Sequence, residues 1–394
     1  MTPRAFDGRR VRICVFGAGA VGGYLAARLL TAKVHEVAVI ARGEHLRAIA
    51  SKGLTFESPS ERFVVRPHVV TDRPRDLPVQ DVVFVTLKAH SQPAAARDIG
   101  SLLGASSTAV FVANGIPWWW NHRGEAPGGA PLPLVDTGAA LWAQVGPRRA
   151  VGCVVYSANE VIRPGFVRHS ANNRWLLGEP SGDLSARLVE LTRLMCESGL
   201  HAEAVADIRR RIWIKLLRNA PLNSLCALTR LPVDELSWDP QLEALSAALI
   251  DEISAIAGAE GVDLSDEVDI AKTALGLGAA IDGSKARSIR PSMLQDALNR
   301  RSMEVEAILG QVQAFARVTR TPSPVLDILV PLVRGLDRSN RERTDGERTD
   351  GERTDGERTD GERTDDERKD DERTDDERTD DERTDGERTD GARA

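Results

Sequence analysis

Cysteine is scarce in this sequence. Its 394 residues contain four cysteines, with no Cys-x-x-Cys pair and no histidine pair at the spacing of metal ligands. The sequence therefore predicts no metal site and gives no sign of an oxidising compartment. Cys14 lies in an apolar run, where we expect it to be a small buried side chain. The four are Cys14, Cys153, Cys196 and Cys226.

Long hydrophobic runs are absent as well. No stretch of 18 apolar residues occurs, and residues 1–10 lack the apolar core of a secretory signal. We therefore expect a soluble, cytoplasmic protein that does not bind membranes. A single hydrophobic core stops growing at about 250–300 residues, so a chain of this length has room for two domains.

The acidic charge lies at one end of the chain. The net charge is −7, yet residues 341–394 carry 13 basic and 24 acidic side chains, so residues 1–340 have a net charge of +4. A mildly basic body suits an anionic small molecule as ligand. It is far too weakly basic to indicate a nucleic-acid partner.

Residues 341–394 are a tandem repeat of Glu-Arg-Thr-Asp-Gly that drifts to Asp-Glu-Arg-Thr-Asp. The repeat contains no Leu, Ile, Val or aromatic residue, so it has nothing to bury that would offset the entropy lost on ordering. We predict a disordered tail over residues 339–394. A segment that binds a partner is the alternative.

The region from residue 11 to residue 206 alternates between short β-rich runs and longer helical patterns. Near-continuous apolar strands separated by helices indicate a parallel sheet covered on both faces. We predict an N-terminal Rossmann domain over these residues. The expected strands are 11–16, 36–41, 81–87 and 109–112, with a helix over 21–30.

The region from residue 207 to residue 338 lacks β-rich runs. Apolar residues recur there at steps of three and four, and a glycine follows them as an expected helix stop. We predict an all-helical C-terminal domain, which gives an α/β protein with a helical second half. The clearest repeat is Leu242, Leu245, Leu249, Ile253 and Ile256, followed by Gly261.

A glycine motif stands directly after the first expected strand and opens the first helix. It reads Gly17-Ala18-Gly19-Ala20-Val21-Gly22. In this context the glycines permit a tight turn, the close approach of a pyrophosphate and the packing of helix on strand. The helix N-terminus adds oriented N–H groups for the phosphates. We predict a dinucleotide cofactor here.

The second expected strand distinguishes the two nicotinamide cofactors. An NAD site has an acidic residue near the strand's carboxyl end for the ribose 2′-hydroxyl. Here the strand ends at Arg42, and Glu36 lies at its opposite end. An arginine can bind a 2′-phosphate with its planar fork. The sequence therefore favours NADPH/NADP.

Three polar residues in the helical half, Lys215, Asn219 and Asn223, are spaced four apart, so a helix would place them on one face. Asparagine has poor helix propensity, which suggests a hydrogen-bonding role for the pair. On spacing alone, a solvated polar face is an equal alternative. We expect Pro221 to kink this helix.

The ordered set of motifs resembles the ketopantoate reductase (2-dehydropantoate 2-reductase) family over nearly all of residues 11–336. The helical domain of that family is similar to the C-terminal domain of 6-phosphogluconate dehydrogenase. Each motif is weak by itself, but the order and approximate spacing match. The motifs are Gly17–Gly22, Thr86-Leu87-Lys88-Ala89, Asn114-Gly115, Lys215 with Asn219 and Asn223, and Ser292-Met293-Leu294-Gln295-Asp296 with Glu304.

The resemblance implies a role for each matching residue on the substrate side. Lys215 would be the general acid that protonates the ketone oxygen while NADPH delivers hydride to the carbon, which fits the negative charge that builds there. Asn219, Asn223 and Ser292 would hold the polar groups of the substrate. Asn114 would contact both the nicotinamide and the substrate.

The resemblance also implies cofactor contacts. Glu304 would lie beside the nicotinamide ribose and order the catalytic site around Lys215. Lys88 would join Arg42 near the 2′-phosphate, and the backbone at Ala158 would line the cofactor cleft. The expected reaction is the reduction of 2-dehydropantoate to (R)-pantoate in pantothenate biosynthesis by a monomer or homodimer.

Three features depart from the family pattern and leave the substrate open. Trp118-Trp119-Trp120 follow Pro117 where the family has a small flexible stretch, and either reshape the mouth of the pocket or pack against the helical domain. Another asparagine of the family, which helps to hold the substrate, would fall near Val233, where this chain has no amide. Residues 156–160 also differ from the family sequence. The alternatives are a reductase of another 2-oxo or 3-oxo acid, and a non-catalytic NADP sensor.

Overall fold

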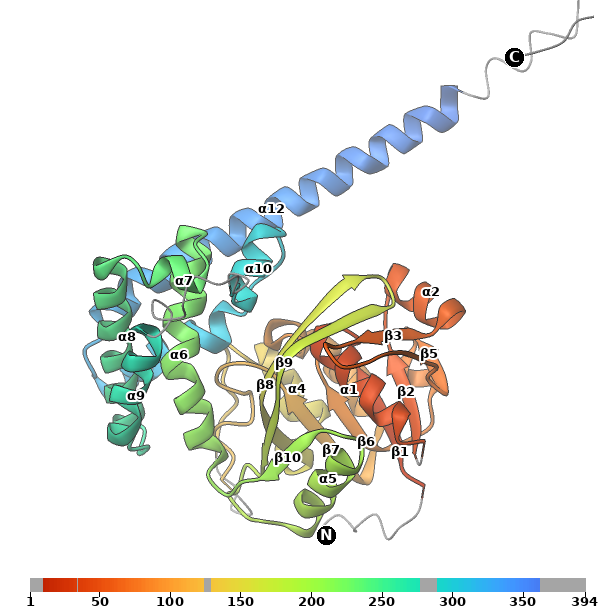
Figure 1. Ribbon diagram of the computed structural model, residues 1–394, viewed down its shortest axis with the longest axis horizontal. Helices are drawn as coiled ribbons and strands as arrows, with labels where there is room; N and C mark the ends of the chain where they lie inside the picture. Colours follow the sequence, from red (N-terminus) through yellow and green to blue (C-terminus); the bar gives the residue numbers. More distant parts are fainter. Residues whose placement is uncertain (1–9, 34, 124–128, 277–288, 362–394) are drawn as a thin grey trace, which may run out of the picture. The chain divides into compact units, whose positions relative to one another are not determined.

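The structure is a computed structural model that describes residues 10–33, 35–123, 129–276 and 289–361 (Figure 1). Met1–Arg341 form one compact unit, and Glu342–Ala394 form a second. Within the first unit, a sheet with its covering helices is followed along the chain by a group of helices, from α6 (Ile208–Thr229) to the first part of α12 (Pro324–Gly361). This is the expected order of a Rossmann-like domain and a helical domain.

One large sheet organises the N-terminal half. Its strands follow each other in the order β4-β3-β9-β8-β7-β6-β1-β2-β5, with β10 beside β9. The expected strands are confirmed to within a residue or two, except that β7 begins earlier than predicted. The strands are β1 (Arg12–Phe16), β2 (Glu36–Ile40), β3 (Leu54–Glu57), β4 (Arg62–Val65), β5 (Val69–Thr71), β6 (Gln80–Val85), β7 (Leu103–Val112), β8 (Ala150–Arg163), β9 (Phe166–Gly178) and β10 (His201–Ala204).

The sheet is mixed, which corrects the expectation of a parallel sheet. Strands β5, β2, β1, β6, β7 and β8 are parallel neighbours, but β8 pairs with β9 and β3 with β4 in antiparallel fashion. The physical reason is the connection between β8 and β9. Only Pro164 and Gly165 separate these strands, and Gly165 has a φ of 74°. So short a link allows a hairpin, whereas a parallel pair needs a long crossover.

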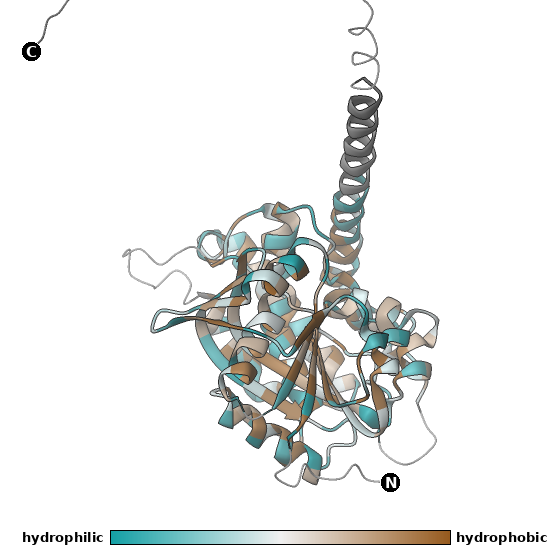
Figure 2. Ribbon diagram, turned by 90° about the vertical axis from the view of Figure 1, so that its right-hand side faces the viewer, coloured by the Kyte–Doolittle hydropathy of each residue, from teal (hydrophilic) through white to brown (hydrophobic). Residues whose placement is uncertain are grey.

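Helices cover both faces of this sheet. Alternate side chains of β1 show the division: Ile13 and Val15 pack with α1 (Ala20–Thr31), while Cys14 and Phe16 pack on the opposite face. The first face is also covered by α5 (Ala186–Glu197), and α2 (Gly43–Lys52) follows β2. The second face carries α3 (Ala96–Ser101) and α4 (Ala140–Gln144). The central strands are correspondingly hydrophobic (Figure 2).

The helical half begins with α6 (Ile208–Thr229), which packs against α8 and α10. The expected helix around Leu249 is confirmed as α8, and Gly261 follows it with a φ of 83°. Pro221 lies inside α6, which continues through it. The remaining elements are α7 (Val233–Leu236), α8 (Pro240–Ala259), α9 (Ser265–Gly276), α10 (Ser292–Leu298), a π-helical turn (Glu306–Gly310), α11 (Gln311–Thr319) and α12 (Pro324–Gly361).

Helix α12 extends further than the sequence suggests. It ends at Gly361 and so includes residues 339–361, for which disorder was expected. Glutamate and arginine are good helix formers, and a helix that is already nucleated can add such residues at little cost. Residues 362–394 of the expected tail lie outside the described residues. No described helix combines the length and apolar character that crossing a membrane requires.

Candidate active site

The glycine motif forms the turn between β1 and α1. Gly17 has a φ of 107°, which favours glycine, and its carbonyl oxygen accepts a 2.5 Å hydrogen bond from the Thr86 hydroxyl. A Cβ at Gly22 would overlap that same carbonyl oxygen, so the helix can pack this closely only without a side chain. Gly19 is exposed, and a Cβ there would meet nothing within 4 Å.

The start of α1 leaves backbone donors free for a ligand. No side chain caps this helix, whose first residues are Ala20 and Val21 after Ala18 and Gly19. Uncapped N–H groups at a helix N-terminus, next to an open glycine, provide the environment that a pyrophosphate requires. The residues present therefore fit a dinucleotide.

Arg42 stands where the sequence places it, two residues after the end of β2 and immediately before α2. The residue is exposed. Among the described residues it makes no ion pair, so its guanidinium is available to an incoming anion. Because β1 and β2 are parallel neighbours, Arg42 and the glycine motif lie at the same edge of the sheet.

Lys88 has two partners in the helical half of the chain. Its ammonium lies 2.6 Å from the carboxylate of Asp296 on α10 and also donates to the carbonyl of Ser302 at 3.1 Å. The Asp296 side chain is buried, and burial raises its pKa while the nearby Lys88 opposes that rise. Lys88 therefore links the sheet domain to the helical domain, and its expected place near a 2′-phosphate stays a prediction.

Glu304 joins three parts of the chain. Its carboxylate accepts a hydrogen bond from the backbone N–H of Ala89 at 2.9 Å and another from the Asn114 amide at 3.2 Å. Ala89 follows β6, Asn114 follows β7, and Glu304 stands just before the π-helical turn. The residue is only 8% exposed. Asn114 and Glu304, which the resemblance assigns to the nicotinamide side of the site, are thus hydrogen-bonded to each other.

Lys215 reaches from α6 to the sheet. Its ammonium donates to the carbonyl of Val155 on β8 at 2.7 Å and lies 5.4 Å from the centroid of the Tyr156 ring. Burial lowers the pKa of Lys215 from 10.5 to about 8, and the charge of Glu304 acts in the opposite direction. The structure therefore gives Lys215 a pKa well below that of a free lysine, and the charge of Glu304 acts on it.

Asn223 is used inside the protein. Its side-chain oxygen accepts hydrogen bonds from the N–H of Met293 at 3.0 Å and from the Ser292 hydroxyl at 3.2 Å. Its amide nitrogen donates to the carbonyl of Asn219 at 2.9 Å. Asn223 is 3% exposed and ties α6 to the first turn of α10. Asn223 and Ser292, which the resemblance assigns to the substrate, are thus in contact with each other.

Asn219 and Ala158 have fewer partners. The Asn219 side chain is partly buried on α6, and its amide makes no hydrogen bond to another described residue. Ala158 is exposed on β8, where its carbonyl accepts from the Ser170 hydroxyl at 3.2 Å. The structure thus leaves the Asn219 amide available and places Ala158 three residues beyond the Lys215 contact at Val155.

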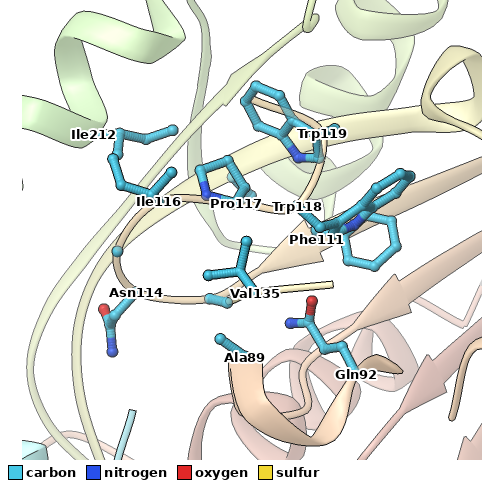
Figure 3. A pocket seen from close by; sticks show the side chains of 13 residues that line it. Ala89, Gln92, Phe111, Asn114, Ile116, Pro117, Trp118, Trp119, Val135 and Ile212 are labelled. Atoms are coloured by element: carbon cyan, nitrogen blue, oxygen red, sulfur yellow. The ribbon is translucent and has the colours of Figure 1, made fainter. Parts of the chain in front are cut away.

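The three tryptophans pack inward. Trp118 lies against Phe111, with ring centroids 5.2 Å apart, and Trp120 lies against Trp213 of α6 at 5.9 Å. All three are at most 1% exposed. Trp118 and Trp119 line a cavity of about 20 Å³ beside β7, and Asn114, which lines it too, points away from them (Figure 3). Of the two expectations, packing against the helical domain is confirmed for Trp120.

Three functional contacts were not expected from the sequence. Thr86 and Asp296 stand within recognised motifs, but no local pattern shows that one would brace the glycine turn and the other would pair with Lys88. Tyr156 lies beneath the Lys215 ammonium, and no spacing relates the two. No group of His, Cys, Asp and Glu among the described residues could hold a metal ion.

Comparison with known proteins decides the family. The family described as ketopantoate reductase PanE/ApbA matches residues 13–182, and its C-terminal domain matches residues 207–337. A 2-dehydropantoate 2-reductase from Mesorhizobium japonicum is 38% identical over 328 residues, which are 83% of this chain and 98% of that protein. The chain belongs to the ketopantoate reductase family. It is therefore an oxidoreductase.

Solved structures show the same fold. The 2-dehydropantoate 2-reductase of Geobacter metallireducens superposes with a TM-score of 0.71 at 26% identity and covers 82% of this chain and 99% of its own. A D-mandelate dehydrogenase, solved with NADH and anilino(oxo)acetate, has a TM-score of 0.70 at 21% identity and covers 84% and 99%. At that identity the second structure supports the fold alone.

Proposed function

We propose that this protein reduces the ketone of 2-dehydropantoate to (R)-pantoate with NADPH. In this proposal Lys215 gives a proton to the ketone oxygen. The single observation that carries the proposal is the position of Lys215, which is partly buried with a pKa of about 8 and hydrogen-bonded at Val155. A general acid works best when its pKa lies near the working pH.

The chain offers a place for each part of the cofactor, which supplies hydride to the ketone carbon when bound. The backbone of Gly17–Gly22 would hold the pyrophosphate, and Arg42 would hold the 2′-phosphate. Asn114 and Glu304 would lie beside the nicotinamide ribose. Ala158 would line the cleft with its backbone. Lys88 would act indirectly, because its ion pair with Asp296 fixes the loop after β6 against α10.

Lys215 would hold its transferable proton at Nζ. The bond to the Val155 carbonyl uses one of the three N–H donors and fixes the direction of the others. As negative charge grows on the ketone oxygen, a remaining N–H would stabilise it and then transfer the proton. Glu304 supports this role, since its negative charge favours the protonated lysine.

The substrate would meet polar side chains from three parts of the chain. The Asn219 amide makes no hydrogen bond to a described residue and would bond the substrate directly. Asn114 has donor and acceptor capacity left after its bond to Glu304. The Ser292 hydroxyl donates to Asn223 and keeps its acceptor sites. Asn223 itself would act by holding Asn219 and Ser292 in position.

A substrate panel tests the proposal. Purified protein is incubated with NADPH or NADH and each of several 2-oxo and 3-oxo acids, and the loss of absorbance of the reduced cofactor is followed. We expect the highest kcat/KM with 2-dehydropantoate and NADPH. Turnover of another oxo acid alone would replace the substrate, and tight cofactor binding without any turnover would indicate an NADP sensor.

A further inference from the structure

A groove opens on the face of the sheet that receives α6. It has a volume of about 570 Å³, is open to solvent and is lined by residues of β8, the β9–β10 pair and α6. Cavities of about 300–1,000 Å³ accommodate small-molecule ligands. The lining residues that matter here are Tyr156, Arg174, Glu203 and Arg218.

The groove adjoins the proposed catalytic lysine. Tyr156 belongs to both places, because it lines the groove and its ring lies 5.4 Å from the Lys215 ammonium. Arg218 follows Lys215 by three residues on α6, a spacing that makes two side chains neighbours on a helix. A molecule whose ketone lies at Lys215 could therefore extend past Tyr156 toward Arg218.

Among the described arginines in and beside the groove, Arg218 differs from Arg174 and Arg211 because it is not paired with a carboxylate. Arg174 is paired with Glu203 at 3.2 Å, and Arg211 is paired with Asp207 at 3.0 Å. Arg218 is exposed and has no ion pair among the described residues.

The charges around the groove also act on the hydroxyl group of Tyr156. Burial raises the pKa of Tyr156, and the charges of Arg174, Arg218 and Arg211 oppose the rise, while Glu267 adds to it. Glu267 itself has a basic partner, Arg210, at 3.6 Å. Of these arginines, Arg218 alone has no partner of opposite charge among the described residues.

We propose that Arg218 is a specificity determinant that binds an oxygen at the end of the substrate remote from the carboxylate. The reduced substrates would be 2-oxo acids with a hydroxyl or carboxylate oxygen at that end, and analogues that end in a methyl group would be poor. This inference rests on the proposed function, because it needs the ketone to lie at Lys215.

The chemistry favours an oxygen acceptor over an apolar group. Arginine offers five N–H donors and no acceptor, and it stays charged throughout the working pH range. A methyl group placed against it would leave those donors without a partner once the groove is filled. Sites built to bond a substrate oxygen reject the analogue that lacks it far more strongly than apolar pockets reject an extra methylene.

A matched pair of substrates tests the proposal. 2-Dehydropantoate and 3,3-dimethyl-2-oxobutanoate differ only in the distal hydroxyl. A hydrogen bond to a charged group contributes about 1.5–3 kcal/mol, so the wild type should prefer the first by about 10–150-fold in kcat/KM. Arg218→Met should bring this ratio close to one, and Arg218→Lys should restore part of it.

The control variant is Arg317→Met, because Arg317 is also an exposed arginine in a helix, near the end of α11. Its ratio should match the wild type, and all three variants should keep the wild-type Tm. An unchanged ratio in Arg218→Met, with both acids turned over, would overturn the inference and leave the proposed function standing. If the wild type turned over neither acid, both this inference and the proposed function would be overturned.

Discussion

The two halves of the proposed site are built in different ways. The cofactor half consists mainly of backbone: a glycine turn, an uncapped helix start and one exposed arginine, all within residues 17–42. The substrate half, in which we include the nicotinamide end of the cofactor, consists of side chains from segments far apart, such as Asn114 and Glu304 or Asn223 and Ser292. A local site survives small shifts of the domains, whereas a dispersed site depends on how the two domains meet.

The largest expected effect lies in the substrate half. Lys215→Ala should lower kcat by about 10²–10⁴-fold, the usual contribution of a general acid, while the Kd for NADPH stays near the wild-type value. Lys215→Arg keeps the charge but is too weak an acid to donate readily, so it should also be slow. Wild-type turnover by the arginine variant would show that only charge is needed.

The second prediction concerns pH. Because the pKa of Lys215 is lowered to about 8 and the protonated form is the active one, kcat should be level below that pH. It should fall about tenfold per pH unit above it. Glu304→Gln should move the fall to lower pH, since the charge of Glu304 raises this pKa. A profile that is level to pH 10 would assign the proton to another group.

The third prediction concerns the cofactor half. Arg42→Ala should weaken NADPH binding by about 10–150-fold, because a charge-assisted contact to the 2′-phosphate is lost. The Kd for NADH should hardly change, since NADH has no such phosphate. Titration of both cofactors by fluorescence measures the two constants. Equal losses for NADPH and NADH would mean that Arg42 supports the fold rather than the choice of cofactor.

The fourth prediction contrasts two asparagines one turn apart on α6. Asn223→Ala should reduce the free energy of unfolding by about 1–3 kcal/mol, because it leaves the buried Met293 N–H without a partner. Asn219→Ala should leave stability nearly unchanged and raise KM. Denaturant unfolding and steady-state kinetics of both variants separate the roles, and matching stability losses would contradict the assignment.

The smallest expected effect is that of the C-terminal repeat. A chain that ends at Arg341 should keep the wild-type Tm and kcat, since residues 342–394 offer no Leu, Ile, Val or aromatic side chain for docking. The chain should not end earlier, because Asn340 is buried and Arg341 pairs with Asp337 at 2.7 Å. A large loss of either quantity would show that the repeat contacts the enzyme.

Local patterns were sufficient for much of the fold. The strand-turn-helix at Gly17–Gly22, the strand ending before Arg42 and the periodic helix around Leu249 were all predicted from neighbouring residues. Strand direction was not predicted at β8 and β9. Both strands are apolar over part of their length, and direction depends on the short link at Pro164 and Gly165 rather than on composition.

The sequence by itself determined the family, the cofactor turn and the set of residues that could form the site. Only the tertiary structure decided what each one contacts. In the structure, Lys88 forms an ion pair with Asp296, and Asn223 forms hydrogen bonds with the start of α10. The side chains of Asn219 and Arg218 are left available for a substrate. The reason is physical: a turn or helix is set by contacts within a few residues, whereas the pKa and partners of a side chain depend on whatever the fold brings against it.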